Sequence, residues 1–157
     1  MHANKRRLFL KGSLAGGAVG VAVGAGLLAP QSVLAAAWPE AGFKAKKLDD
    51  AVKGAMGSAG TEASDKIKVK APDIAENGAV VPVTVSTDLA AEAIAVIAEQ
   101  NPVPLAAMFT LGTGAEGFVS TRIKMGKTSD VVAVVKSGGK LYSARKGVKV
   151  TIGGCGG

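Results

Sequence analysis

Residues 131–139 read Val131-Val132-Ala133-Val134-Val135-Lys136-Ser137-Gly138-Gly139, and this stretch decides the fold class. A continuous apolar run rich in β-branched valine is typical of a buried strand. A Gly-Gly pair close behind such a run is typical of a tight β-hairpin, because both central residues of that turn have a positive φ. We therefore expect a buried strand that turns back into an antiparallel neighbour.

Strand patterns also occur on both sides of this stretch. Alternating or continuous apolar runs occupy residues 67–70, 81–86, 93–98, 105–111, 118–125 and 148–152. About seven short strands separated by turns are the pattern of an all-β, antiparallel sandwich. Pro82 fits a strand start or a sheet edge, where its missing N–H is not needed. The stretch 89–99 also fits a helix, which leaves two interpretations for residues 93–98.

A helix is expected over residues 40–55. Apolar residues recur there at helical spacing between charged ones: Leu48, Ala51, Val52 and Ala55. Gly54, Gly57 and Gly60 are expected to weaken and end this helix, because glycine is a poor helix former. Residues 57–61 are then expected to form a loop.

The first 37 residues have the features of an export signal. Residues 1–11 contain four basic residues and no acidic one: Lys5, Arg6, Arg7 and Lys11. An uncharged run follows at 12–29, and Ala35-Ala36-Ala37 is the small-residue site that signal peptidase accepts. The alternative is a retained membrane anchor, since eighteen uncharged residues approach the length of a spanning helix. The six glycines in this run favour cleavage, and no stable anchoring is then expected.

The basic part of this signal resembles the twin-arginine export motif. The match consists of Arg6, Arg7, Phe9, Leu10 and Lys11, while Lys5 stands where the motif has Ser or Thr. The resemblance implies a bacterial protein that folds before it crosses into the periplasm. Because the chain lacks cofactor ligands, we expect it to travel with a folded partner.

Composition excludes several classes of function. The net charge of +7 comes from 19 basic and 12 acidic residues, and removal of the four basic residues in the signal leaves +3. Clustered cations with aromatic stacking groups are absent, which argues against nucleic-acid binding. The single His, at position 2, excludes a Ser-His-Asp triad and a His-based metal centre in the folded domain. The single Cys excludes an internal disulfide and a clustered zinc or iron–sulfur site, so we expect no cofactor and no metal.

That cysteine lies in the last five residues, Gly153-Gly154-Cys155-Gly156-Gly157. Glycine has wide backbone freedom and the smallest cross-section, so we expect a flexible arm at 153–157 that places the thiol about 10 Å beyond the last strand. Such a tethered thiol fits into a narrow active-site channel of another protein. Arg145, Lys146 and Lys149 would favour the thiolate if they lie beside it.

The arm has two other interpretations. A frayed tail with an incidental cysteine is one, but a free thiol in an exported protein is readily oxidised. Lipidation is the other, and Cys155 has neither the position of a prenylated cysteine nor that of a bacterial lipobox.

The signal, the valine-rich β domain and the ending Val-Lys-Val-Thr-Ile-Gly-Gly-Cys-Gly-Gly together resemble the SoxY family. SoxY is the sulfur-carrier subunit of the bacterial thiosulfate-oxidising (Sox) system. The resemblance implies an immunoglobulin-like sandwich at 38–152, between the signal at 1–37 and the arm at 153–157. It also implies a heterodimer with a SoxZ-like subunit, which has no signal of its own and is co-exported.

The resemblance further implies that Cys155 holds sulfur intermediates covalently while Gly153, Gly154, Gly156 and Gly157 keep the arm flexible. A haem c enzyme would load thiosulfate, a manganese-dependent hydrolase would release sulfate, and a molybdenum dehydrogenase would oxidise the remaining sulfane sulfur. The chain itself would be a carrier and not an enzyme.

Rival functions are a ubiquitin-like carrier that uses a C-terminal thiocarboxylate, a thiol peroxidase and a plain interaction domain. The first needs ATP, which is absent outside the cytoplasm, and the second needs a fixed cation or helix N-terminus beside its thiol.

Three weaker signals in the sequence have simpler explanations. Residues 112–117 match the spacing of a dinucleotide-binding motif but precede a strand pattern, which favours a loop. Met56, Met108 and Met125 are far apart for a copper site, and Asp49-Asp50 fits a solvated helix face.

Overall fold

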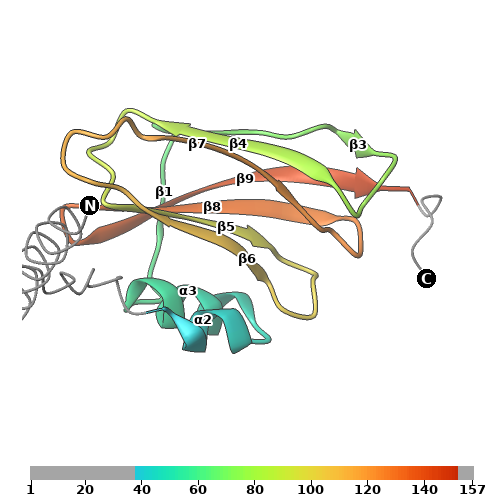
Figure 1. Cartoon of the computed structure of the whole chain (residues 1–157), viewed down its shortest axis with the longest axis horizontal. Helices are drawn as coiled ribbons and strands as arrows, with labels where there is room; N and C mark the ends of the chain where they lie inside the picture. Colours follow the sequence, from blue (N-terminus) through green and yellow to red (C-terminus); the bar gives the residue numbers. More distant parts are fainter. Residues whose placement is uncertain (1–37, 152–157) are drawn as a thin grey trace, which may run out of the picture. The chain divides into compact units, whose positions relative to one another are not determined.

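The computed structural model describes residues 38–151, which form two β-sheets and a pair of short helices (Figure 1). The helices are α2 (Glu40–Lys44) and α3 (Leu48–Met56). The strands are β1 (Glu62–Ala63), β2 (Ile67–Lys70), β3 (Ile74–Ala75), β4 (Val81–Thr87), β5 (Ala93–Ala98), β6 (Leu105–Thr110), β7 (Phe118–Ile123), β8 (Ser129–Ser137) and β9 (Lys140–Val150).

The elements form three layers. The larger sheet has the order β1-β9-β8-β5-β6, with β3 also paired to β9, and the smaller sheet has the order β2-β4-β7. The smaller sheet covers one face of the larger sheet, and α2 and α3 cover the other (Figure 1). The predicted all-β sandwich is therefore confirmed, with a helical layer added outside it.

The predicted hairpin joins β8 to β9. Ser137 pairs with Lys140, so the connection is Gly138 and Gly139, with φ angles of 57° and 76°. Both values are in the left-handed region that glycine adopts without strain. The strand that starts after this turn is the longest among the described residues, and its end leads to the predicted arm.

β5 is buried on both faces, which explains its continuous apolar sequence. It lies between β8 and β6, with antiparallel pairing to both. Ile94 and Val96 face the smaller sheet, whereas Ala95 and Ile97 face the helices. The helical alternative for this stretch is excluded because each face of the strand meets a separate core.

The smaller sheet has one buried and one exposed face. Along β4, Val81, Val83 and Val85 are buried between the sheets, and the residues between them are not. Pro82 is the second residue of β4 and pairs with Arg122, beyond the last β2–β4 pair, Lys70 with Thr84. The predicted position of this proline at a strand start is confirmed.

The prediction of one helix over residues 40–55 is wrong. The chain turns at Ala45, whose ψ of 147° is extended, and forms two helices that pack against each other. A Cβ on Gly54 would lie 2.4 Å from the backbone nitrogen of Gly42, so only glycine allows the two backbones to approach this closely. Gly54 therefore does not end the helix. That role falls to Gly57, which has a φ of 85°.

Two short strands were not predicted. β1 and β3 have two residues each and pair with β9 in parallel, whereas an antiparallel architecture was expected throughout. A two-residue strand is too short to show alternation in the sequence. The long strands account for the seven that were predicted, and these two raise the number within residues 38–151 to nine.

Candidate functional site

The predicted site residues lie outside the described part of the chain. This applies to Cys155 and the four glycines around it, to Ile152, and to the export residues Arg6, Arg7, Phe9, Leu10 and Lys11. The structure does describe the segment from which the arm starts. We call Lys149, Val150 and Thr151 the arm root.

β3 holds the arm root from one side. The backbone N–H of Lys149 donates to the carbonyl oxygen of Asp73 at 2.9 Å, and that of Thr151 donates to the carbonyl oxygen of Ala75 at 3.1 Å. The hydroxyl of Thr151 donates to the same Ala75 oxygen at 3.4 Å. Because Ala75 is buried in the core, these bonds tie the arm root to the body of the domain.

Thr128 holds the arm root from the β8 side. Its Oγ1 accepts a hydrogen bond from the backbone N–H of Val150 at 2.9 Å and lies 3.4 Å from the carbonyl oxygen of the same residue. The β8–β9 ladder ends at Ser129 with Val148, so Thr128 extends the pairing by a side chain where the backbone ladder has stopped.

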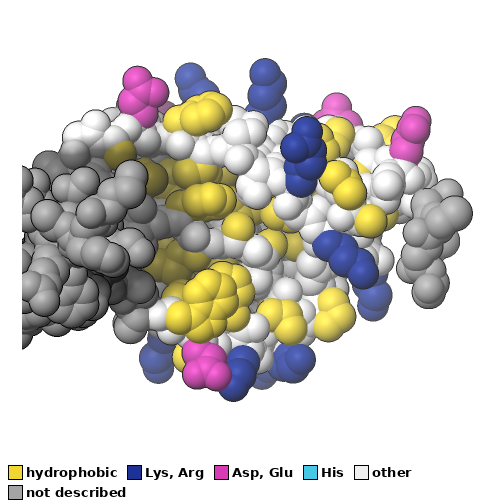
Figure 2. All heavy atoms as spheres, viewed as in Figure 1, with side chains coloured by type: hydrophobic (Ala, Val, Ile, Leu, Met, Phe, Trp, Pro, Cys, Tyr) yellow, Lys and Arg dark blue, Asp and Glu magenta, His cyan; other side chains and the backbone are white. Residues whose placement is uncertain are grey.

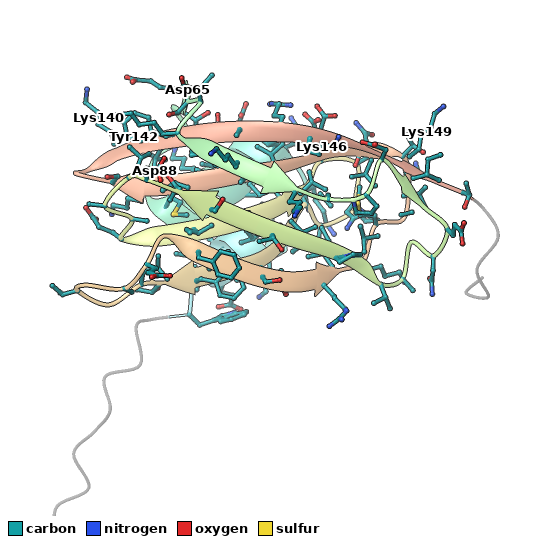
Figure 3. The ribbon with its side chains drawn as sticks, turned by 90° about the horizontal axis from the view of Figure 1, so that it is seen from above. Asp65, Asp88, Lys140, Tyr142, Lys146 and Lys149 are labelled. Atoms are coloured by element: carbon teal, nitrogen blue, oxygen red, sulfur yellow. The ribbon has the colours of Figure 1, made fainter. Side chains whose placement is uncertain are left out.

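The cations near the end of β9 are mostly engaged elsewhere. Nη1 of Arg145 lies 3.3 Å from Glu99 and 3.8 Å from Asp130. Lys146 forms an ion pair with Asp73. Lys149 is exposed and forms no ion pair with any other residue in the range 38–151. Figure 3 shows Lys146 and Lys149 towards the end of the domain where β9 finishes.

These contacts bear on the condition set by the sequence, that the three cations favour the thiolate only if they lie beside it. Arg145 precedes Thr151 by six residues, which is about 20 Å along a strand, and its charge is matched by two carboxylates. Lys146 is matched by Asp73. Lys149 is therefore the cation of the three that is best placed to act on the arm.

The hydrogen bond from Lys146, followed by its positive charge, holds the pKa of Asp73 below its usual value. This ion pair joins Asp73, the residue before β3, to Lys146 in β9. It lies next to the β3–β9 pairing that holds the arm root. It is exposed, so it contributes modestly to the stability of the whole domain. Its local effect is to keep β3 against β9.

A surface cavity of the domain lies far from the arm root. It is on the outer face of the larger sheet, beside α3, and is lined by Ala55, Met56, Glu92, Ala93, Met108, Thr110 and Lys136. The cavity residue Lys136 pairs with Leu141 of β9. Leu141 precedes Thr151 by ten residues, which is about 30 Å along a strand. Cys155 is four residues beyond Thr151 and reaches at most about 14 Å from it. The thiol therefore cannot enter this cavity.

No metal site was found among residues 38–151, where three or more His, Cys, Asp or Glu side chains never gather in a suitable arrangement. Within the same range, no helix is long and apolar enough to span a membrane. Met125 is buried in the core between the sheets, and Met56 and Met108 pack in the core beneath the helices. The loop at 112–117 connects β6 to β7, as expected.

Sequence patterns did not reveal the residues that hold the arm root. Asp73 and Ala75 lie in a stretch that shows no periodicity, and Thr128 lies in the loop before β8. Their roles depend on pairings between positions more than twenty residues apart in the chain. Pro72, just before β3, is the only local sign of a defined turn there.

Comparisons with known proteins agree with this geometry. Residues 52–155 match the family model described as "Sulfur oxidation protein SoxY". The structure of the sulfur carrier protein SoxY from Chlorobium limicola f thiosulfatophilum is 47% identical, with a TM-score of 0.61 over 68% of this chain and 97% of that chain. A superoxide reductase (neelaredoxin) from Ignicoccus hospitalis shares the fold, with 19% identity and a TM-score of 0.51 over 58% and 95% of the two chains. No curated protein matches the sequence.

Proposed function

The chain belongs to the SoxY family of sulfur-oxidation proteins, and from this premise we propose that it carries the sulfur intermediates of thiosulfate oxidation as covalent adducts of Cys155 in the periplasm. The 47%-identical relative is named a sulfur carrier, which supports a carrier and not an enzyme. The rival assignments as a thiol peroxidase, a ubiquitin-like protein or an inert interaction domain receive no support from this family.

The observation that carries the proposal is the anchored arm root. β9 runs beside β8 for the whole length of that strand, and its end is fixed by Ala75 and Thr128 just before the arm begins. Cys155 follows within about 14 Å of this fixed point and cannot reach the cavity of its own domain. A thiol in this position serves the active sites of other proteins.

The chemistry is that of a thiolate nucleophile that later becomes an anchor. In loading, the thiolate of Cys155 would bond to the outer sulfur of thiosulfate, and the two electrons released would pass one at a time through the haem c of the loading enzyme to its electron acceptor. The product is a cysteine S-thiosulfonate. In release, water attacks the sulfonate sulfur, the bond to the neighbouring sulfur breaks, and sulfate and protons leave a persulfide on Cys155. A molybdenum dehydrogenase would then oxidise that outer sulfur to a sulfonate, with three water molecules supplying the oxygen atoms and the enzyme accepting the six electrons released.

The SoxY family functions within the Sox system, and we expect a SoxZ-like subunit to form a heterodimer with this chain. The signal supports this expectation, because the residues around Arg6 and Arg7 resemble those that export folded proteins. A folded partner without its own signal would leave the cytoplasm by the same event. The periplasm is the compartment that this route implies.

The test is an intact mass measurement without reductant. The protein is purified from the periplasm of thiosulfate-grown cells, beside a Cys155→Ser variant. We expect adducts with the masses of added sulfur or thiosulfonate on the wild type and none on the variant. Adducts that persist on the serine variant would exclude Cys155 as the attachment site, and a second small β protein in the preparation tests the heterodimer.

A further inference from the structure

We propose that Ile74 and Val80, flanked by Lys127 and Lys149, form a docking rim around the arm root for the enzymes that act on Cys155. The inference rests on the proposed function of Cys155 and extends it to the body of the domain. The partner is a protein surface that surrounds an active-site channel and presents apolar side chains with carboxylates beside them.

Because the arm is short, an enzyme that acts on Cys155 must come close to the arm root. Cys155 is four residues beyond Thr151, so its Cα lies within about 14 Å of a residue that β3 holds in place, and its sulfur lies only one short side chain farther. An enzyme that reacts with this sulfur deep in a channel must bring the rim of the channel close to Thr151. The surface around the arm root is therefore the part of the domain that each such enzyme meets.

This surface exposes aliphatic side chains that the fold itself does not need. Ile74 is 56% exposed and Val80 is 50% exposed, and among the described residues the other large exposed hydrophobics are Trp38 and Phe118. Exposed apolar groups at a functional end of a domain indicate a contact surface. At the end where β9 finishes, hydrophobic side chains lie among charged ones (Figure 2).

Both aliphatic residues lie within two residues of a contact with the arm root. Ile74 is the register partner of Lys149 in the β3–β9 pair, so their side chains extend from the same face of the sheet. Val80 lies two residues after Gly78, where an added Cβ would lie 2.7 Å from Cγ1 of Val150. The segments that carry Ile74 and Val80 therefore both contact the end of β9.

The charges on this surface define the partner further. Lys127 precedes Thr128, which contacts Val150, and both Lys127 and Lys149 are exposed. Glu76 is an exposed acid in the loop between β3 and β4, which also contains Val80, and Asp73 is paired with Lys146. Cations are thus in excess, and a rim with carboxylates complements them. A contact made by two aliphatic and two lysine side chains is small, and small interfaces are typical of transient complexes. This suits a carrier that must leave each enzyme after one reaction.

The test uses the purified heterodimer of this chain with its SoxZ-like subunit, after Cys155 has been loaded with tetrathionate. The thiolate attacks a central sulfur of tetrathionate, which forms the cysteine S-thiosulfonate and releases thiosulfate. The probe is the hydrolase from the same organism that releases sulfate from this adduct. The variant is Ile74→Ser with Val80→Ser, and the control is Phe118→Ser, because Phe118 is 54% exposed but lies at the opposite end of β7 from the arm root.

We expect the double variant to lower kcat/KM for sulfate release about tenfold through a higher KM, with kcat unchanged. Phe118→Ser should stay within about twofold of the wild type. Equal kcat/KM for the wild type and the double variant would overturn the docking rim while the carrier function stands. If the wild type forms no adduct on Cys155, the proposed function fails first and the rim fails with it. A loaded peptide of residues 150–157 should react at least about tenfold less efficiently than the complex.

Discussion

Thr151 donates its backbone N–H to the carbonyl oxygen of Ala75 at 3.1 Å, and Ala75 is 5% exposed in the core between the two sheets. This bond connects the last described residue of the chain to the interior of the sandwich. Cys155 follows this held strand end by four residues in the sequence. A sulfur carrier benefits from such a starting point, because the position of the strand end limits the places that the thiol can reach.

Replacement of Thr128 by Val should loosen the arm root. The variant keeps the shape of the side chain but removes Oγ1, which accepts the N–H of Val150 at 2.9 Å. Loss of one such bond destabilises by about 0.5–1.5 kcal/mol, and the amide of Val150 should exchange with solvent about tenfold faster. Hydrogen exchange measured by NMR tests this, with Thr128→Ser as the control that keeps the oxygen. Equal exchange in the two variants would show that the hydroxyl does not hold Val150.

Replacement of Asp73 by Asn should make β3 less firmly held in a pH-dependent way. The pKa of Asp73 is held below its usual value of 3.8 by Lys146, so the folded state favours the carboxylate. The stabilisation is therefore present above pH 3.8 and is lost as the pH falls through the lowered value. We expect wild type and variant to differ in the exchange of the Lys149 and Thr151 amides at neutral pH and to converge in acid.

The control for this pH dependence is a double-mutant cycle with Lys146→Gln. In that background the Asp73→Asn change should have little effect at any pH, because the pair is already broken. An undiminished difference in the Lys146→Gln background would assign the effect of Asp73 to another partner.

Asn101 should stabilise the loops at the same end of the domain. Its Nδ2 donates to the carbonyl oxygen of Lys124 at 2.7 Å, and its Oδ1 accepts the N–H of Gly126 at 2.9 Å. Asn101→Ala removes both bonds and should lower the free energy of unfolding by about 1–2 kcal/mol in urea titrations. Asn101→Asp keeps the acceptor alone, so it should fall between the two, and an aspartate variant as stable as the wild type would contradict the role of Nδ2.

The sequence predicts those parts of the fold that depend only on neighbouring residues, such as a buried strand and a tight turn. Val131–Val135 and the Gly138-Gly139 turn predicted the hairpin because burial and positive φ are properties of those residues themselves. Cys155 was predicted as the attachment site from local sequence as well, because it is a single thiol among glycines; it lies outside the described residues and stays a prediction. By contrast, the bond between Thr128 and Val150 joins the loop before β8 to the end of β9, and nothing in the sequence around either residue indicates the other.

The helices show the same limit more sharply. Spacing alone indicated one helix because the apolar residues of 48–55 and the charges before them fit a single helical stretch. The break at Ala45 arises because a folded-back pair buries Ala51 and Val52 against the larger sheet while α2 covers them. Helix propensity predicts that Gly54 weakens the helix, but in the structure its lack of a Cβ permits the contact with α2.

Replacement of Gly54 by Ala therefore tests the helical pair directly. In an isolated helix, alanine is about 1 kcal/mol more favourable than glycine. Here the new Cβ would lie 2.4 Å from the nitrogen of Gly42, which is backbone and cannot move aside alone. We expect a net loss of about 1–2 kcal/mol in the free energy of unfolding, because overpacking exceeds the gain in helix propensity. Gly60→Ala is the matched control, since no atom lies within 4 Å of its added Cβ. It should leave stability unchanged or raise it by less than about 1 kcal/mol, and a stabilised Gly54→Ala variant would mean that the two helices do not pack closely in solution.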